Sequence, residues 1–116
     1  MDSILTSIKK MLGIAEDYTQ FDMDIIMLIN NSLNTLNQLG IGTEGFMISG
    51  KKENWEDFVG DSLKYVGMVQ TYVYVKVKIA FDSNNMSGSV LEAYKEMARE
   101  AEWRMRTQVE LNKKEG

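Results

Sequence analysis

The residue types that this sequence lacks limit the chemistry it can perform. It contains no cysteine and no histidine, which excludes thiolate nucleophiles, disulfides, Ser-His triads and the usual Cys or His metal sites. The remaining reactive cluster is acidic and consists of Glu56, Asp57 and Asp61 in the run WEDFVGD. Nothing in the sequence positions a partner group for these acids, so they are explained more simply as turn formers and helix caps.

Nucleotide binding is not indicated either, because GxxxxGK[ST] does not occur, and the one GxGxxG spacing, GIGTEG at residues 40–45, follows a predicted helix instead of a strand. We therefore predict that the protein is not an enzyme and has no catalytic residue, cofactor or metal. A carboxylate enzyme built on the three acids is the least favoured hypothesis, and loss of an activity on Asp57→Asn would be needed to support it.

Composition indicates one globular domain, predicted to span residues 1–116 with a flexible tail from about residue 111. The 116 residues are 44% hydrophobic and 26% charged, which suits a single core. The net charge of -4 includes no basic block, which argues against sequence-specific DNA binding. The start MDSILTSIKKMLGI is not a secretory signal, and no apolar run approaches roughly 18 residues. We expect a soluble protein, intracellular where it is made, that does not contact membranes.

Three segments have clear helix patterns. Asp2 or Ser3 can cap a first helix that ends at Gly13, with Lys9 and Lys10 on its polar side. The second helix is predicted over about 22–39: Asp22 is its N-cap, Phe21 packs on Ile26, and Gly40 and Ile41 form a Schellman end. Ser89 and Glu92 form a capping box for the last helix, whose tail after Leu111 is expected to fray.

The segment from Asp61 to Phe81 fits two structures. Its run TYVYVKVKIAF alternates apolar and polar residues and is rich in β-branched residues, which slightly favours a strand over residues 72–80. Val66, Val69 and Val73 also recur at helical spacing. Periodicity alone leaves the two alternatives open.

A long glycine-rich insert covers Gly40 to Asp61. Its apolar run Phe46-Met47-Ile48 is flanked by glycines and predicts a short β-strand. That strand either pairs with a second one near 55–59 or adds its edge to another chain.

The outer face of the second helix is unusual for a solvated surface. No charged residue occurs from Ile25 to Thr43, and Asn30, Asn34 and Asn37 lie on one side. Because an uncharged polar face suits a surface covered by another subunit, we predict a subunit interface made of Asn30, Asn34, Asn37, Phe46, Met47 and Ile48. The alternative is a plain asparagine-rich surface. Trp103, on the charged last helix, is either a contact residue or folds over the edge of the core.

Several motifs together resemble one known family. They are FDMDIIMLINNSLNTLNQLGIGTEGFMISG, then ENWEDFVGD, then IAFD, then EWRM in the last helix. This order is similar to the head–tail connector (adaptor) proteins of long-tailed phages and prophages of Gram-positive bacteria, over about residues 4–109. The resemblance implies a mainly α fold, a small bundle of about four helices with the strand-bearing loop between the second and third. It also implies that 61–81 is helical. Relatives often have proline after the FD pair, so the loop at Asp82 is expected to be looser here.

The same resemblance implies the function and partners. Family members form closed rings, usually dodecameric, that dock under the portal, join capsid to tail and let double-stranded DNA pass without specific binding. A tail-proximal stopper or tail-completion protein follows. We therefore expect a structural virion assembly protein at the head–tail junction, present in the host cytoplasm before assembly, with Trp103, Arg104 and Arg106 docking on the portal. The alternative is a small helical regulator of phage or prophage origin that binds one protein as a monomer or dimer.

Overall fold

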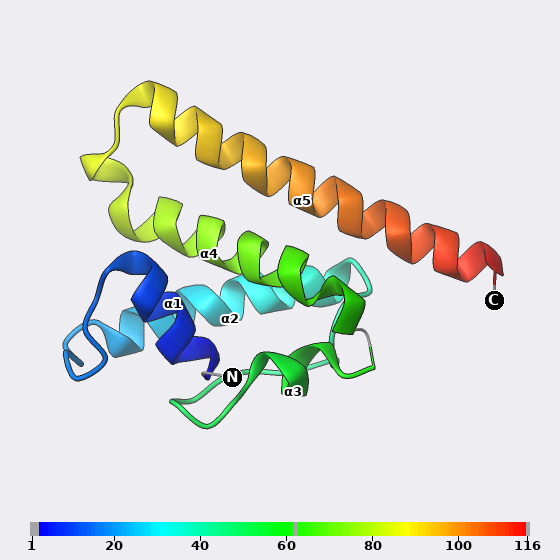
Figure 1. Ribbon diagram of the computed structural model, residues 1–116, viewed down its shortest axis with the longest axis horizontal. Coiled ribbons are helices and arrows are strands. Elements are labelled where there is room, and N and C mark those ends of the chain that lie inside the picture. Colours follow the sequence, from blue (N-terminus) through cyan, green and yellow to red (C-terminus); the bar gives the residue numbers. More distant parts are fainter. Residues whose placement is uncertain (1–2, 62, 116) are drawn as a thin grey trace.

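The computed structural model describes residues 3–61 and 63–115, in which the chain forms five α-helices and two 3₁₀ turns. In chain order these are α1 (Ile4–Leu12), α2 (Asp22–Gln38), α3 (Trp55–Val59), the 3₁₀ turn η1 (Leu63–Tyr65), α4 (Val66–Asp82), the 3₁₀ turn η2 (Ser83–Asn85) and α5 (Gly88–Glu115). Helix α4 lies between α5 on one side and the other three helices on the other side (Figure 1). The predicted mainly α fold class is confirmed.

The central position of α4 explains why an alternating sequence forms a helix. Its buried residues point in several directions around the helix axis: Val69, Tyr72, Val73, Val75 and Val77. Because α4 contacts α5, α2, α1 and α3, nearly every side needs apolar side chains. The strand interpretation of 72–80 is therefore wrong, and the helix implied by the family resemblance is confirmed. This tertiary burial outweighs the β propensity of the valines.

Helix α1 begins and ends as expected, but one of its lysines does not face solvent. The Ser3 side chain accepts a hydrogen bond from the Thr6 N–H at 3.1 Å, and Gly13 ends the helix at a φ of 79°. Lys9, predicted on the polar side, is fully buried. Its Nζ donates to the carbonyls of Glu16 and Tyr18 at 3.0 and 2.7 Å, because the α1–α2 connection folds back over α1.

Helix α2 confirms one predicted end and corrects the other. The Ile41 N–H donates to the Leu36 carbonyl at 2.9 Å, and Gly40 has a φ of 89°, which is the Schellman arrangement. Phe21, not Asp22, is the N-cap residue. The Asp22 carboxylate instead forms a 2.9 Å ion pair with Lys9, so it is used to join α1 to α2.

The connection from α2 to α4 contains a helix rather than strands. Phe46, Met47 and Ile48 belong to no strand, and within residues 3–61 and 63–115 the one isolated β-bridge joins Ser3 to Asn54. The predicted strand and its suggested partner near 55–59 are therefore not found. Residues 55–59 form α3, which begins with a capping box in which the Asn54 N–H donates to Asp57 at 2.9 Å. This agrees with the interpretation of Asp57 as a cap.

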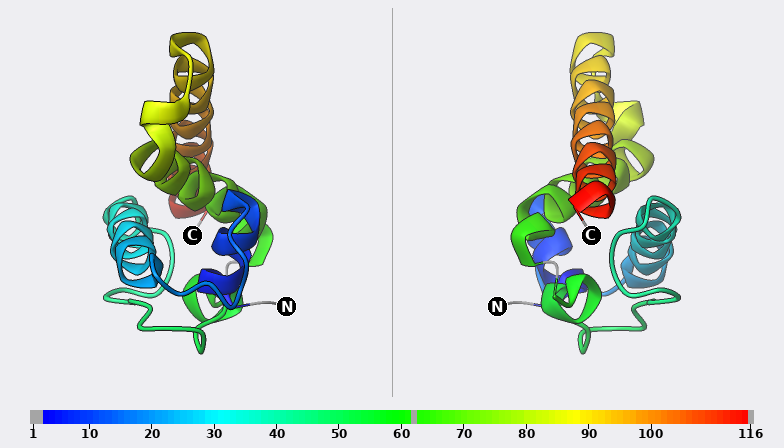
Figure 2. Two further views of the ribbon diagram at one scale, coloured as in Figure 1. Left: turned by 90° about the vertical axis from the view of Figure 1, so that its left-hand side faces the viewer. Right: turned by 90° about the vertical axis from the view of Figure 1, so that its right-hand side faces the viewer.

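Helix α5 is longer than predicted at its C-terminal end. It starts after Ser87, whose side chain accepts from the Val90 N–H at 3.3 Å, so Ser87 takes the capping role expected of Ser89. The helix continues past Leu111 to Glu115, where fraying was expected, and tail flexibility stays a prediction. In Figure 2, α5 lies above α4, and α1 and α2 lie below it, one toward each side of the picture.

Candidate subunit-contact surfaces

One of the predicted interface asparagines, Asn30, holds the long loop against α2. Its side-chain amide donates to the Ile48 carbonyl at 3.0 Å, and its side-chain oxygen accepts from the Ile48 N–H at 2.8 Å. These are the two hydrogen bonds that a neighbouring strand would otherwise provide. The Asn30 side chain therefore takes the place of a neighbouring strand for the backbone of Ile48.

Asn37 holds the start of the same loop two turns further along α2. Its amide donates to the carbonyls of Ile41 and Thr43 at 2.9 and 3.2 Å, and its oxygen accepts from the Gly45 N–H at 3.2 Å. With Asn30, it fixes both ends of the segment 41–48. We call Asn30 and Asn37 the loop clamp. The sequence shows their alignment but not this intramolecular role.

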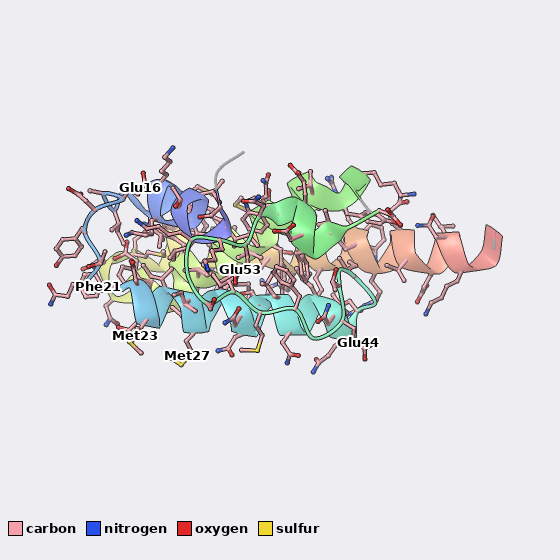
Figure 3. All side chains as sticks on the ribbon, turned by 90° about the horizontal axis from the view of Figure 1, so that it is seen from below. Glu16, Phe21, Met23, Met27, Glu44 and Glu53 are labelled. Carbon is pink, nitrogen blue, oxygen red and sulfur yellow. The ribbon has the colours of Figure 1, made fainter. Side chains whose placement is uncertain are left out.

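The outward side of α2 carries an uncharged surface that we call the α2 stripe: Met23, Met27, Asn31, Asn34 and Gln38. Met23 and Met27 are 85% and 57% exposed, and Figure 3 shows both at the edge of the molecule, on the outer side of α2. Met47, 67% exposed, adds a third methionine from the clamped loop. Asn34 is exposed, so of the predicted asparagines it is the one in this stripe.

Two other predicted interface residues contribute mainly to packing. Ile48 is 3% exposed and belongs to the core. Phe46 is half-buried, and its ring lies 5.5 Å from that of Phe58. Whether any of the six residues contacts another subunit stays a prediction. Sequence reasoning missed Met23 and Met27, although their four-residue spacing off the core side of α2 was a usable signal.

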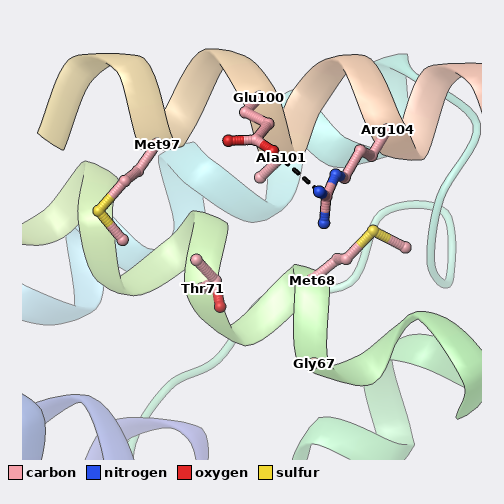
Figure 4. Close-up of a pocket in the computed structure, with 7 residues that line it drawn as sticks. All are labelled: Gly67, Met68, Thr71, Met97, Glu100, Ala101 and Arg104. Carbon is pink, nitrogen blue, oxygen red and sulfur yellow. Dashed lines mark ion pairs between the residues drawn. The ribbon is translucent and has the colours of Figure 1, made fainter. Parts of the chain in front are cut away.

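A groove lies between α4 and α5. It has a volume of about 200 Å³ and is lined by Gly67, Met68, Thr71, Met97, Glu100, Ala101 and Arg104. Figure 4 shows Met68 and Met97 at its two ends, with α2 behind the two helices. A 2.9 Å ion pair joins Arg104 to Glu100. We call this the α4–α5 groove; it was not predicted, because it exists only when two distant segments pack together.

The predicted portal-docking residues lie in the C-terminal half of α5. Trp103 is 64% exposed, which contradicts the alternative that it folds over the core edge. Arg104 and Arg106 form ion pairs with the acids four residues earlier, at 2.9 and 3.0 Å. An exposed tryptophan beside paired arginines offers apolar area and hydrogen-bond donors to a partner.

Comparison with known proteins identifies the family. The sequence profile of the phage connector proteins matches residues 4–112. The chain belongs to the phage connector protein family. No curated protein and no solved structure matches the sequence.

Membership in this family confirms the resemblance noted from the motifs. The connector is a phage structural and assembly protein, a component of the virion that assembles with other virion proteins such as portal or tail proteins. Within residues 3–61 and 63–115, no helix of the connector is long and apolar enough to cross a bilayer. The same residues contain no group of three or more His, Cys, Asp or Glu side chains able to hold a metal ion.

Paired side chains hold the turn between α4 and α5 in place. At the end of α4, hydrogen bonds from Asn85 and then Lys78 lower the pKa of Asp82. The hydrogen bond to Asp82 raises the pKa of Lys78, and their atoms lie 2.8 Å apart. Tyr74 packs edge-on against Tyr94 of α5 at 6.5 Å, and burial raises its pKa. This cluster joins the end of α4 to the start of α5.

Proposed function

We propose that the connector is a ring-forming adaptor that docks beneath the portal, joins capsid to tail and lines the passage for DNA. The observation that carries this proposal is the α2 stripe, an exposed helix face with two methionines and no charged residue from Ile25 to its C-terminal end. Solvated helix faces normally carry charged side chains, so a face of this type suits burial by another subunit. A closed ring, twelve copies by family resemblance, buries such a face on every subunit.

The proposed ring has three kinds of neighbour. The portal lies on its capsid side, a stopper or tail-completion protein lies on its tail side, and double-stranded DNA passes through its centre. Before assembly the subunit is present in the host cytoplasm.

The C-terminal half of α5 is the proposed portal contact. Trp103 offers the largest exposed side chain on this helix, and buried tryptophan and arginine side chains often dominate the free energy of protein association. Arg104 and Arg106 are also exposed and can donate hydrogen bonds to acceptors on the portal.

A ring that passes DNA should not bind it tightly, because each phosphate contact adds affinity. The cations of α5 fit this requirement. Arg99, Arg104 and Arg106 each pair with a glutamate of the same helix at 2.8 to 3.0 Å. Acidic partners reduce the positive potential that would hold phosphates.

The proposal is tested by the mass of the purified connector, measured by light scattering alone and after mixing with the portal protein of the same phage or prophage. We expect a ring in at least one sample. A monomer or dimer that ignores the portal would contradict the proposal and favour the small helical regulator.

Portal docking needs its own variants. We expect Trp103→Ala and Arg106→Ala to weaken portal binding while leaving the melting temperature nearly unchanged, because the two side chains are 64% and 53% exposed and neither lines the α4–α5 groove. Met11→Ala, at a 47% exposed position on α1, is the matched control and should bind normally. Unchanged binding by both α5 variants would refute this docking site.

A further inference from the structure

We infer that the α4–α5 groove is the second half of the contact between subunits and receives Met23 and Met27 of the neighbouring copy. This inference rests on the proposed ring and assigns the partner of the α2 stripe. A ring needs a heterologous contact, in which two different surfaces of each subunit meet. The exposed Met23 and Met27 offer a protruding surface, and the α4–α5 groove offers a recessed one.

The two surfaces are placed for a head-to-tail contact. In Figure 4 the groove is seen with α2 behind α4 and α5. The core residues of α2, such as Ile25, Ile29 and Leu36, are fully buried, so the methionines on the other side of the helix point away from the groove (Figure 3). The stripe of one copy can therefore enter the groove of a second copy. The stripe of that second copy stays exposed and can enter the groove of a third.

The groove has the size and lining for single side chains. At about 200 Å³, it is smaller than the roughly 300–1,000 Å³ of pockets that hold drug-sized ligands. Its lining includes Gly67 and Ala101, two small residues that leave room, and the thioethers of Met68 and Met97. Unbranched methionine side chains adapt to such irregular space, so Met23 and Met27 are well suited to enter it.

Charge favours this pairing over contact between two identical surfaces. Residues 3–61, which include α2, hold nine acidic and four basic side chains, whereas residues 63–115, which form the groove, hold seven acidic and nine basic ones. Asp24 flanks Met23, and Lys64 lies one turn before Gly67 at the end of the groove. Asp24 beside the stripe and Lys64 beside the groove attract each other when these two surfaces meet, while two stripes in contact would bring two copies of Asp24 together.

The absence of cysteine from the sequence allows a direct cross-linking test. Three exposed methionines of similar exposure are each replaced: Met27→Cys in the stripe, Met97→Cys in the groove and Met11→Cys on α1 as control. Variants are mixed in pairs at high concentration, with and without the portal, and oxidised with glutathione disulfide. Thermal melts under reducing conditions first establish that each variant folds.

The expected result is a disulfide-linked heterodimer from Met27→Cys with Met97→Cys, and none from Met11→Cys with Met97→Cys. A chain that carries both Met27→Cys and Met97→Cys should give a ladder of dimers, trimers and larger products, because each copy then has both halves of the contact. Because neither single variant is expected to form a homodimer with itself, such a ladder then requires head-to-tail joining.

Two results would overturn the inference. Efficient homodimers of Met27→Cys alone would show that two stripes meet each other, and absence of the mixed heterodimer in all samples would show that the groove is not the partner. Light scattering of the unmodified protein with the portal separates the two proposals. A portal-bound ring without the mixed cross-link would leave the proposed function standing and reject only the groove.

Discussion

Replacing Asn30 with alanine tests whether the loop clamp holds the loop in place of a strand. The substitution removes both hydrogen bonds to the Ile48 backbone, at 2.8 and 3.0 Å. A buried backbone group left without a partner costs about 1–3 kcal/mol. Asn30 is only half-buried, so water can reach the site in part, and the lower end of this range, about 1 kcal/mol for each group, is the appropriate estimate.

We therefore expect Asn30→Ala to lower the free energy of unfolding by about 2 kcal/mol. For a domain of this length, each kcal/mol shifts the melting temperature by roughly 3–6 °C, so the expected drop is about 6–12 °C. Calorimetry and urea unfolding give both quantities. The loop should also become accessible to proteases near Met47, which is already exposed.

Asn34→Ala is the matched control one turn along the same helix. Both variants gain the same helix propensity, up to about 0.7 kcal/mol, so their difference isolates the clamp. Asn34 is exposed, and we expect its substitution to change stability by no more than about 0.5 kcal/mol. If Asn30→Ala proved as stable as Asn34→Ala, the explanation of the strandless loop would be wrong.

Three further changes probe other contacts. Gly42 has a φ of 82°, and in Gly42→Ala the new methyl carbon would lie 2.3 Å from the Phe58 ring. We expect the free energy of unfolding, measured in urea, to fall by roughly 3 kcal/mol. The control is Gly45→Ala, where the φ is 74° and the space is open, and the expected fall is about 1 kcal/mol. Lys9→Met leaves a carboxylate and two carbonyls without their partner, and a fall of about 3–5 kcal/mol is expected in the same assay; a change below about 1 kcal/mol would contradict the structural role of this lysine. Burial raises the pKa of Glu53, but hydrogen bonds from its own backbone and from Ser49 lower it more, so the net pKa lies below its usual value of 4.5. Since a lowered pKa stabilises the folded state above the unfolded pKa, stability should fall as pH drops below about 4.5, and Glu53→Gln should flatten that decline in urea midpoints measured against pH.

The helices could be predicted because their signals are local. Ser3, Gly13 and Gly40 mark helix ends within a few residues of the hydrogen bonds that they make. The same locality explains one partial error, because Ser87 and Ser89 lie two residues apart at the start of the last helix and only the backbone geometry selects Ser87. The long-range environment of α4 could not be inferred from its alternating pattern, which left helix and strand both open, and only the family resemblance decided in favour of the helix.

The loop could not be predicted because its hydrogen-bond partners are distant in sequence. Phe46-Met47-Ile48 has the composition of a strand, but its ladder partner is the Asn30 side chain, 18 residues before Ile48. Lys9 similarly looked like a solvated lysine, because the chain that covers it follows at residues 16–22. In contrast, the Asn54 and Asp57 capping box was visible in the sequence and could have indicated α3.

The interface prediction combined two kinds of asparagine that the fold separates. Asn30 and Asn37 point toward the loop and hold it, whereas Asn34 lies in the outward stripe with Met23 and Met27. Loss of assembly in an Asn30 or Asn37 variant would therefore have two explanations, a displaced loop or a lost contact. Substitutions at Asn34 and Met27 alter the stripe without touching the clamp. Assembly defects at these two positions, with unchanged melting temperatures, are thus the measurement that assigns a role to this face of α2.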